Sequence, residues 1–437
     1  MTSRTIEIQA DPRKRFFIDM LTRDINLVDC ILDLIDNSID SILHKTKFDP
    51  MKGLSNEERK KLDKYKISIK FNEAEFTIED NSDGVGAKDI AERVFRFGAE
   101  KNPQKKMGLS VYGIGMKRAF FKIGRLIEFK SVSKKEAVSV NLNVDKWVDD
   151  EENWDLSGKQ ESIQGTALSG TKITITKINS ETAPNFKSSA FETRLIEKLQ
   201  TTYGIFLGYG LVIKVNNKNV ERKMPTVSQS SKIKVSSKLF NKDGVQIKII
   251  AGISPDDDKR SNGWFIFCNG RMILEGDKTP NTGWGNGFLR KFHSSTNRFV
   301  GFVYFKSEDV NLLPWTTTKN GVNFESSVYQ YALVQMVKIA RPIVSFLVKK
   351  YQQDKSMREV DDMTKDAKDT PVSEIKKGEG LFDPDIKSLS GKNKENEITY
   401  TVPLKDIKKV KKALQDDEIS NSEIGKKTFY YFLDHEE

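Results

Sequence analysis

The chain contains little of what several common classes of protein need. Two cysteines, Cys30 and Cys268, occur in 437 residues, which excludes a disulfide framework. Three scattered histidines, His44, His293 and His435, are too far apart in the sequence for us to expect a zinc site. No apolar run approaches the length of a membrane span, and the N-terminus lacks the apolar core of a signal peptide. We therefore expect a soluble, cytoplasmic protein without membrane contact.

The residues that are present suffice for a large core and give a moderate positive charge. A hydrophobic content of 37% over this length predicts two or three domains. Lysine and arginine number 72 against 62 aspartates and glutamates, so the formal net charge is +10. This excess favours acidic partners such as nucleic acid, although solubility alone would also explain it.

Hydrophobic periodicity divides the chain into four segments. Residues 1–210 predict an α+β domain with an antiparallel or mixed sheet. Residues 211–351 predict a second domain that ends in a long helix, kinked at Pro342. Residues 352–396 are charged and poor in large apolar side chains, so we expect a flexible linker. Residues 397–437 regain apolar periodicity and predict a small C-terminal element that contacts a partner protein. The expected elements are a hairpin at 67–79, strands at 125–133, 136–143, 170–177, 211–215, 245–252, 263–268 and 299–305, and helices at 30–40, 88–97, 115–123, 190–208 and 325–351.

Residues 30–40 carry an unusual distribution of acidic side chains. Helical spacing places leucines and isoleucines on one side and Asp29, Asp33, Asp36, Asn37 and Asp40 on the other. Aspartate and asparagine are poor helix formers, and their short oxygen ligands suit a hard cation such as Mg²⁺. An ordinary acidic helix surface is an equally open interpretation of this stretch alone.

Two glycine-containing motifs follow this helix. Asp80 ends a predicted strand before Gly84, an arrangement that places a carboxylate at the mouth of a site where backbone approaches a flat ligand. The same stretch, Asn-Ser-Asp-Gly, is also a good turn. Gly113 and Gly115 open a helix with Lys117 in its first turn, and free N–H groups there suit a phosphate. A plain glycine-rich turn into an amphipathic helix is the alternative.

Taken together and in this order, the three motifs resemble those of the GHKL superfamily, which includes DNA gyrase B, HSP90-like chaperones, sensor histidine kinases and MutL. The resemblance implies a Bergerat-type ATP-binding sandwich of helices on a mixed β-sheet, with ATP and Mg²⁺ as cofactors. It assigns Asp33 as the base that activates water, Asn37 as the Mg²⁺ ligand and Asp80 as the partner of the adenine amino group. The further nucleotide contacts that it implies are Gly84, Gly113, Ile114, Gly115, Met116, Lys117 and Thr171.

Within the superfamily the pattern is closest to MORC-like and MutL-like proteins. Residues 112–117 are similar to the MORC lid, and residues 263–273 look like part of a βαβ transducer domain of ribosomal-protein-like fold. Lys319 lies where a loop of that domain reaches the γ-phosphate. The resemblance implies closure of a lid segment, residues 98–112, and an ATP-dependent homodimer that works as a clamp or switch in a DNA-linked repair or defence process.

Three positions depart from the family pattern, and other functions stay open. Asp33 replaces the usual glutamate, which would slow hydrolysis, while Ser82 and Ser110 replace glycines. The alternatives are a protein chaperone, a nucleotide-sensing scaffold with little turnover and, least supported, a histidine kinase. DNA is a candidate partner through lysine runs at 45–70 and 405–412, which solvated surfaces would also explain.

Overall fold

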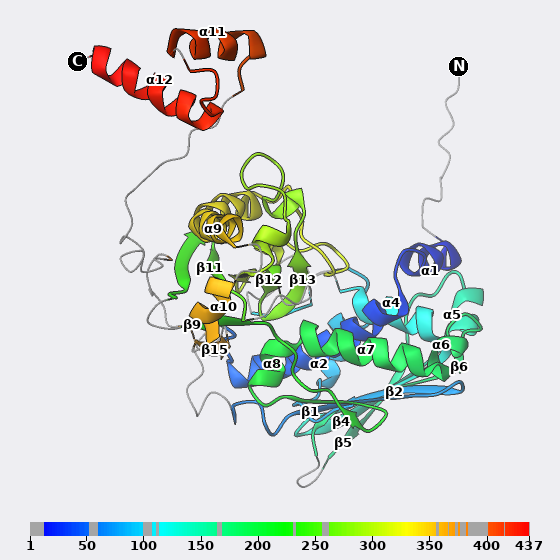
Figure 1. Cartoon of the computed structure of the whole chain (residues 1–437). Helices are drawn as coiled ribbons and strands as arrows, with labels where there is room; N and C mark the ends of the chain where they lie inside the picture. The colour runs from blue at the N-terminus through cyan, green and yellow to red at the C-terminus, as the bar shows by residue number, and fades with distance from the viewer. Residues whose placement is uncertain are drawn as a thin grey trace, which may run out of the picture. The chain divides into compact units, whose positions relative to one another are not determined.

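The computed structural model describes residues 13–51, 60–98, 107–110, 113–163, 168–229, 233–255, 262–354, 358–365, 367–371, 375, 382, 401–414 and 416–436. The chain divides into two compact units, Met1–Pro384 and Asp385–Glu437. The first unit is α+β and contains two mixed sheets (Figure 1). Every predicted site residue belongs to this unit. The second unit is helical in the residues described.

An eight-stranded mixed sheet runs through the first half of the described chain. Its order is β5-β4-β3-β6-β2-β1-β7-β8, with β1 and β7 parallel and the other neighbours antiparallel. Alternation in β1 buries Ile67, Ile69 and Phe71 and leaves Lys66 and Lys70 exposed to solvent, as a half-buried strand requires. The strands are β1 (Lys66–Phe71), β2 (Glu75–Asp80), β3 (Gly124–Val132), β4 (Glu136–Asn143), β5 (Gly158–Ser162), β6 (Gly170–Ile178), β7 (Val212–Val215) and β8 (Lys218–Asn219).

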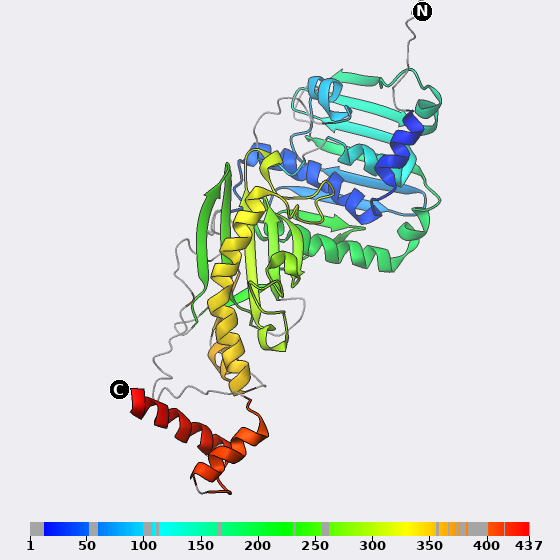
Figure 2. The same ribbon diagram turned by 90° about the horizontal axis from the view of Figure 1, so that it is seen from above.

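Helices cover one face of this sheet, with α2 and α7 lying across it in both views (Figures 1 and 2). The side chain of Asn26 caps α2 by accepting a hydrogen bond from the Asp29 N–H, and Lys47 ends the helix in a left-handed conformation. The isoleucines of α2 are buried, and α4 packs beside it. The helices here are α1 (Lys14–Thr22), α2 (Leu27–Thr46), α3 (Ala87–Asp89) continuing into π-helical η2 (Ile90–Val94), α4 (Gly115–Ile123), α5 (Val144–Asp149), α6 (Ala183–Lys187), α7 (Ser189–Thr202) and α8 (Gly204–Gly208).

A five-stranded mixed sheet of order β10-β11-β14-β12-β13 follows. Its central strands are buried along almost their whole length, and α9 (Ser327–Gln353) packs on β11 and β14 without interruption at Pro342. The strands are β10 (Ser236–Lys242), β11 (Val245–Ile253), β12 (Gly263–Cys268), β13 (Arg271–Asp277) and β14 (Phe299–Lys306), with single 3₁₀ turns η3 (Pro280–Thr282), η4 (Ser294–Thr296) and η5 (Val310–Leu312).

Among the described residues, α9 has the length and apolar composition of a membrane span, which inspection of the sequence did not anticipate. Half of the most apolar stretch of this helix is buried within the protein. The helix packs on the second sheet in the way that the core helix of a soluble domain does.

Two structural features cross the domain boundaries that we expected. Strand β7, which we expected in the second domain, pairs with β1 and extends the first sheet beyond residue 210. Within the expected linker, α10 (Arg358–Lys365) forms, and β15 (Lys368–Pro371) pairs with β9 (Thr226–Gln229). Among the described residues of this segment, Val360, Ile375 and Phe382 are buried, which its average composition concealed.

The C-terminal unit contains α11 (Leu404–Leu414) and α12 (Asn421–Glu436). Ile419 and Ile424 are buried within it, whereas Phe429, Tyr430 and Tyr431 are exposed. The lysines of α11 are spaced so that four of them share one helical face: Lys405, Lys408, Lys409 and Lys412.

Candidate active site

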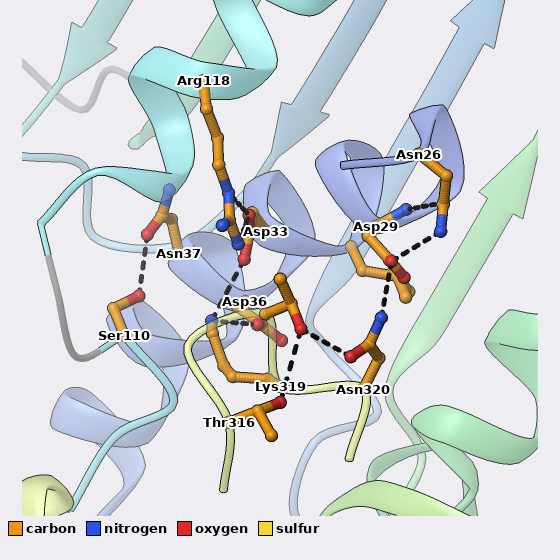
Figure 3. Close-up of polar contacts among 12 residues, drawn as sticks. Asn26, Asp29, Asp33, Asp36, Asn37, Ser110, Arg118, Thr316, Lys319 and Asn320 are labelled. Atoms are coloured by element: carbon orange, nitrogen blue, oxygen red, sulfur yellow. Dashed lines mark hydrogen bonds and ion pairs between the residues drawn. The ribbon is translucent and has the colours of Figure 1, made fainter. Parts of the chain in front are cut away.

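The acidic side chains of α2 are buried or half-buried, so this face is not an ordinary acidic surface. Each aspartate has partners within the protein, and those partners come from distant parts of the chain (Figure 3). Asp29 accepts a hydrogen bond from Asn320 Nδ2 at 3.0 Å, and Asp40 accepts from the N–H groups of Leu109 and Ser110 at 2.5 and 2.8 Å. The helix therefore organises several segments around itself.

Asp33 is held between two cations. Its Oδ2 accepts from Arg118 Nε at 2.6 Å and is also paired with the Arg118 Nη2 group, while Lys319 Nζ lies 3.2 Å from Oδ1. Gly115, in the first turn of α4, packs so closely that a Cβ there would lie 3.0 Å from the Asp33 Cγ. Both carboxylate oxygens therefore have a cationic partner in this conformation.

Asp36 is the centre of a second, fully buried cluster. Lys319 Nζ donates to its Oδ2 at 2.5 Å, while Arg271 Nε and the Tyr203 hydroxyl donate to its Oδ1 at 3.0 and 2.8 Å. Burial alone would raise the pKa of this carboxyl, but the charges of Arg271 and Lys319 outweigh that effect and lower the pKa. Asp36 is thus a permanent anion at the junction of α2 and the second sheet, a role that its sequence position did not indicate.

Asp80 lies at the end of β2 in a ring of hydrogen-bond donors. Its carboxylate accepts from Ser38 Oγ at 2.7 Å, from Ser82 Oγ at 2.5 Å and from the Thr171 N–H at 3.3 Å. Gly84 has φ = +67°, and a Cβ there would lie 2.0 Å from the Val132 carbonyl oxygen. Both interpretations of this motif therefore hold. Gly84 closes a tight turn against β3, and Asp80 is held in place beside that turn.

The N-terminus of α4 carries a buried cation. Gly113 adopts φ = +62°, and Lys117 Nζ donates to its carbonyl oxygen. Lys117 is 5% exposed and has no acidic partner among the described residues. Burial lowers its pKa to about 8, since nothing compensates the desolvated charge. A buried ammonium that has no acidic partner among the described residues, beside the N–H groups of a helix N-terminus, fits an anion such as a phosphate group.

The predicted lid segment is anchored from two sides at residues 107–110. Ser110 Oγ donates to Asn37 Oδ1 at 2.8 Å, and Asn269 Nδ2 donates to the Gly108 carbonyl at 2.9 Å. Asn269 is in the left-handed region at φ = +47° and forms the turn between β12 and β13 with Gly270 at φ = +91°. Residues 99–106 and 111–112, where we expected the rest of the lid, lie outside the described residues.

The predicted site residues converge on one cavity of about 290 Å³. Gly84 alone of that set is absent from its lining, because it contacts β3 instead. Arg118, which sequence reasoning missed, also lines it. The predicted residues that line the cavity are Asp33, Asn37, Asp80, Gly113, Ile114, Gly115, Met116, Lys117, Thr171 and Lys319.

The charges around the cavity suit a nucleotide with its metal. The ion-pair cluster contains two carboxylates, Asp33 and Asp36, and three cations, so one positive charge is unmatched. The half-buried amide oxygen of Asn37 is a ligand type that Mg²⁺ accepts. The residues present therefore fit both a polyphosphate and a hard cation.

A search of curated proteins gave no match to this chain. Residues 25–179, which run from the start of α2 to the end of β6, match the family described as histidine kinase-, DNA gyrase B-, and HSP90-like ATPase. Over these residues the chain is similar to the ATPases of the GHKL superfamily.

Proposed function

We propose that this chain binds ATP with Mg²⁺ in the cavity beside α2 and hydrolyses the bond between the β- and γ-phosphates. The observation that carries the proposal is the meeting of Asp33, Asn37 and Asp80 with Lys319 around one cavity, beside an ion-pair cluster that has one more cation than carboxylates. Members of the superfamily bind ATP with Mg²⁺, and the family match covers the segment that supplies the first three residues.

Each residue has a role that its position supports. Asp80 would accept a hydrogen bond from the adenine amino group, with Thr171 holding the carboxylate in place. Backbone N–H groups at Gly113–Met116 and the ammonium of Lys117 would hold phosphate oxygens. Lys319 would neutralise charge that develops on the γ-phosphate. Bound Mg²⁺, held through Asn37, would neutralise phosphate charge.

Asp33 is proposed as the group that orients and deprotonates water, and its surroundings favour slow turnover. Oδ2 contacts Arg118 and Oδ1 contacts Lys319, so an attacking water has to share Oδ1 with Lys319 or take the place of its ammonium. General-base catalysis needs a free acceptor within hydrogen-bond reach of the water. This pairing favours a second candidate function, a nucleotide-sensing scaffold in which ATP is held for long periods.

We further propose that ATP drives a MORC-like or MutL-like cycle of lid closure, domain coupling and N-terminal dimerisation, in a DNA-linked process. The second sheet and α9 would act as the transducer domain. Two residues of this region, Arg271 and Lys319, contact α2 directly, which supports such coupling. The lysine face of α11 and the exposed aromatics of α12 support contacts with DNA or a partner protein, respectively.

Replacing Lys319 with alanine tests this cross-domain role. We expect kcat to fall by about tenfold to a hundredfold, because one charge on the γ-phosphate loses its counter-ion. We also expect loss of the dimer that light scattering should detect in the wild type with a non-hydrolysable ATP analogue but not with ADP. A matched control is Lys338→Ala, in the exposed part of α9. Normal turnover together with a normal dimer in the Lys319 variant would contradict the role.

Repeating the light scattering with duplex DNA tests the clamp, since a DNA clamp should retain DNA only in its dimeric state.

The lowered pKa of Lys117 predicts how nucleotide affinity depends on pH. Without nucleotide this lysine titrates near pH 8, because burial disfavours its charged form. A bound phosphate favours the charged form and raises the pKa, so ATP binding above pH 8 takes up a proton. We expect the ATP Kd to be flat below pH 7 and to increase between pH 8 and 9.5, by at most about tenfold per pH unit. Titration calorimetry in buffers of different ionisation enthalpy measures the proton uptake. In the variant Lys117→Met the rise above pH 8 should disappear; its persistence would show that another group titrates.

A further inference from the structure

A closed set of contacts ties Lys319 to α2. Its ammonium lies on Asp36, its carbonyl oxygen accepts from Arg271 Nη1, and Arg271 Nε in turn donates to Asp36. The residue has φ = +55°, which a non-glycine residue adopts only when surrounding contacts hold it there. Lys319 also lines the cavity, whereas Asp36 is fully buried behind it.

In this cluster each carboxylate has an arginine of its own, and the two carboxylates share Lys319. Asp33 has its own arginine, Arg118, and Asp36 has its own arginine, Arg271, together with the Tyr203 hydroxyl. Lys319 lies between the two carboxylates, at 3.2 Å from Asp33 and 2.5 Å from Asp36 (Figure 3). If the lysine leaves, each carboxylate keeps an arginine, so no buried anion is left uncompensated. Lys319 is therefore the cation of this cluster that is able to move.

We infer that Asp36 is a positioning residue that holds Lys319 when no nucleotide is bound and competes with the γ-phosphate for it. The inference rests on the proposed function. Asp36 itself does not line the cavity, so it acts on the nucleotide through the lysine. In this arrangement ATP, but not ADP, must draw Lys319 away from Asp36. Part of the attraction between Lys319 and the γ-phosphate is thereby used to break the contact of Lys319 with Asp36, which joins the 316–320 loop to α2.

The variant Asp36→Asn tests the competition. It keeps the size of the side chain and removes the charge that holds the lysine. We expect ATP affinity to increase by about tenfold while ADP affinity stays the same, a selectivity that general structural damage would not produce. The gain should vanish in a Lys319→Met background, because the two residues act on the same contact. Asp29→Asn is the matched control: Asp29 contacts the neighbouring Asn320 but not Lys319, so neither affinity should change.

A second variant covers the case in which Asp36→Asn fails to fold. Tyr203→Phe removes a hydrogen bond from Asp36 Oδ1, so the carboxylate should hold Lys319 more strongly. Here we expect ATP affinity to fall by about twofold to threefold with ADP affinity unchanged. An unchanged ratio of ATP to ADP affinity in the variants that fold, or a gain that persists without Lys319, would overturn the role of Asp36 alone. Failure of the wild-type protein to bind either nucleotide would overturn the proposed function itself.

Discussion

Replacing Asp80 with asparagine is expected to abolish nucleotide binding, with a loss of affinity of at least about a hundredfold, or about 2.7 kcal/mol. The carboxylate at the end of β2 is surrounded by donors from Ser38, Ser82 and Thr171, so its oxygens are fixed as acceptors. Asparagine would turn an N–H₂ group toward either these donors or the adenine amino group. A buried donor that faces another donor loses its hydrogen bond and stays desolvated.

Titration calorimetry with ATP and with ADP measures this loss. Glu79→Gln is the control, because Glu79 is the preceding residue of β2 but is exposed to solvent. A thermal melt must show that the Asp80 variant is folded. If such a folded variant binds ATP with wild-type affinity, Asp80 does not contact the adenine, and the cavity holds a different part of its ligand or a different ligand.

Asp33→Asn is expected to leave ATP binding intact and to lower kcat by about 10²–10⁴, the range typical of removing a general base. The side chain keeps its size but no longer accepts a proton. The substitution also leaves Arg118 without its carboxylate, so we expect a lower melting temperature without nucleotide and partial recovery with ATP, whose phosphates supply negative charge.

Single-turnover measurements with saturating ATP separate binding from chemistry in this variant. The matched control is Asp29→Asn, one helical turn earlier on the same face of α2. Equal turnover in wild type and Asp33→Asn would remove Asp33 as the base. If both are equally slow but bind ATP tightly, the nucleotide-sensing scaffold becomes the better description of the protein.

The local elements of the ATP-binding region were predictable because their signals are local. Glycine followed by an amphipathic run predicted α4 at its observed bounds, and alternation predicted the β1–β2 hairpin. Edge strands such as β10 were missed because their exposed side chains give no regular alternation. We expected the predicted residues to gather around one cavity because the order of their motifs resembles that of the GHKL superfamily.

The partners of the α2 carboxylates were not predictable in the same way. Arg118 lies 85 residues from Asp33, Arg271 lies 235 residues from Asp36, and Lys319 lies 283 residues from Asp36. No periodic pattern connects positions so far apart. One signal was available: Arg118 lies three residues after Gly115, so it shares the face of α4 that packs on α2. The sequence therefore left the acidic face of α2 open between a hard-cation site and an ordinary surface, whereas its aspartates contact protein groups.

The turn between β12 and β13 joins two contacts that have been described separately. Asn269 holds the predicted lid segment at the Gly108 carbonyl, and Arg271, two residues later, holds Asp36 and the Lys319 carbonyl. Because both side chains project from one short, buried hairpin, a displacement of that hairpin strains both contacts at once. States with one contact broken and the other intact are therefore disfavoured, and we expect a nucleotide that displaces this hairpin to break both contacts together. Spectroscopic labels on the lid and on the 316–320 loop should therefore report the same midpoint in a nucleotide titration.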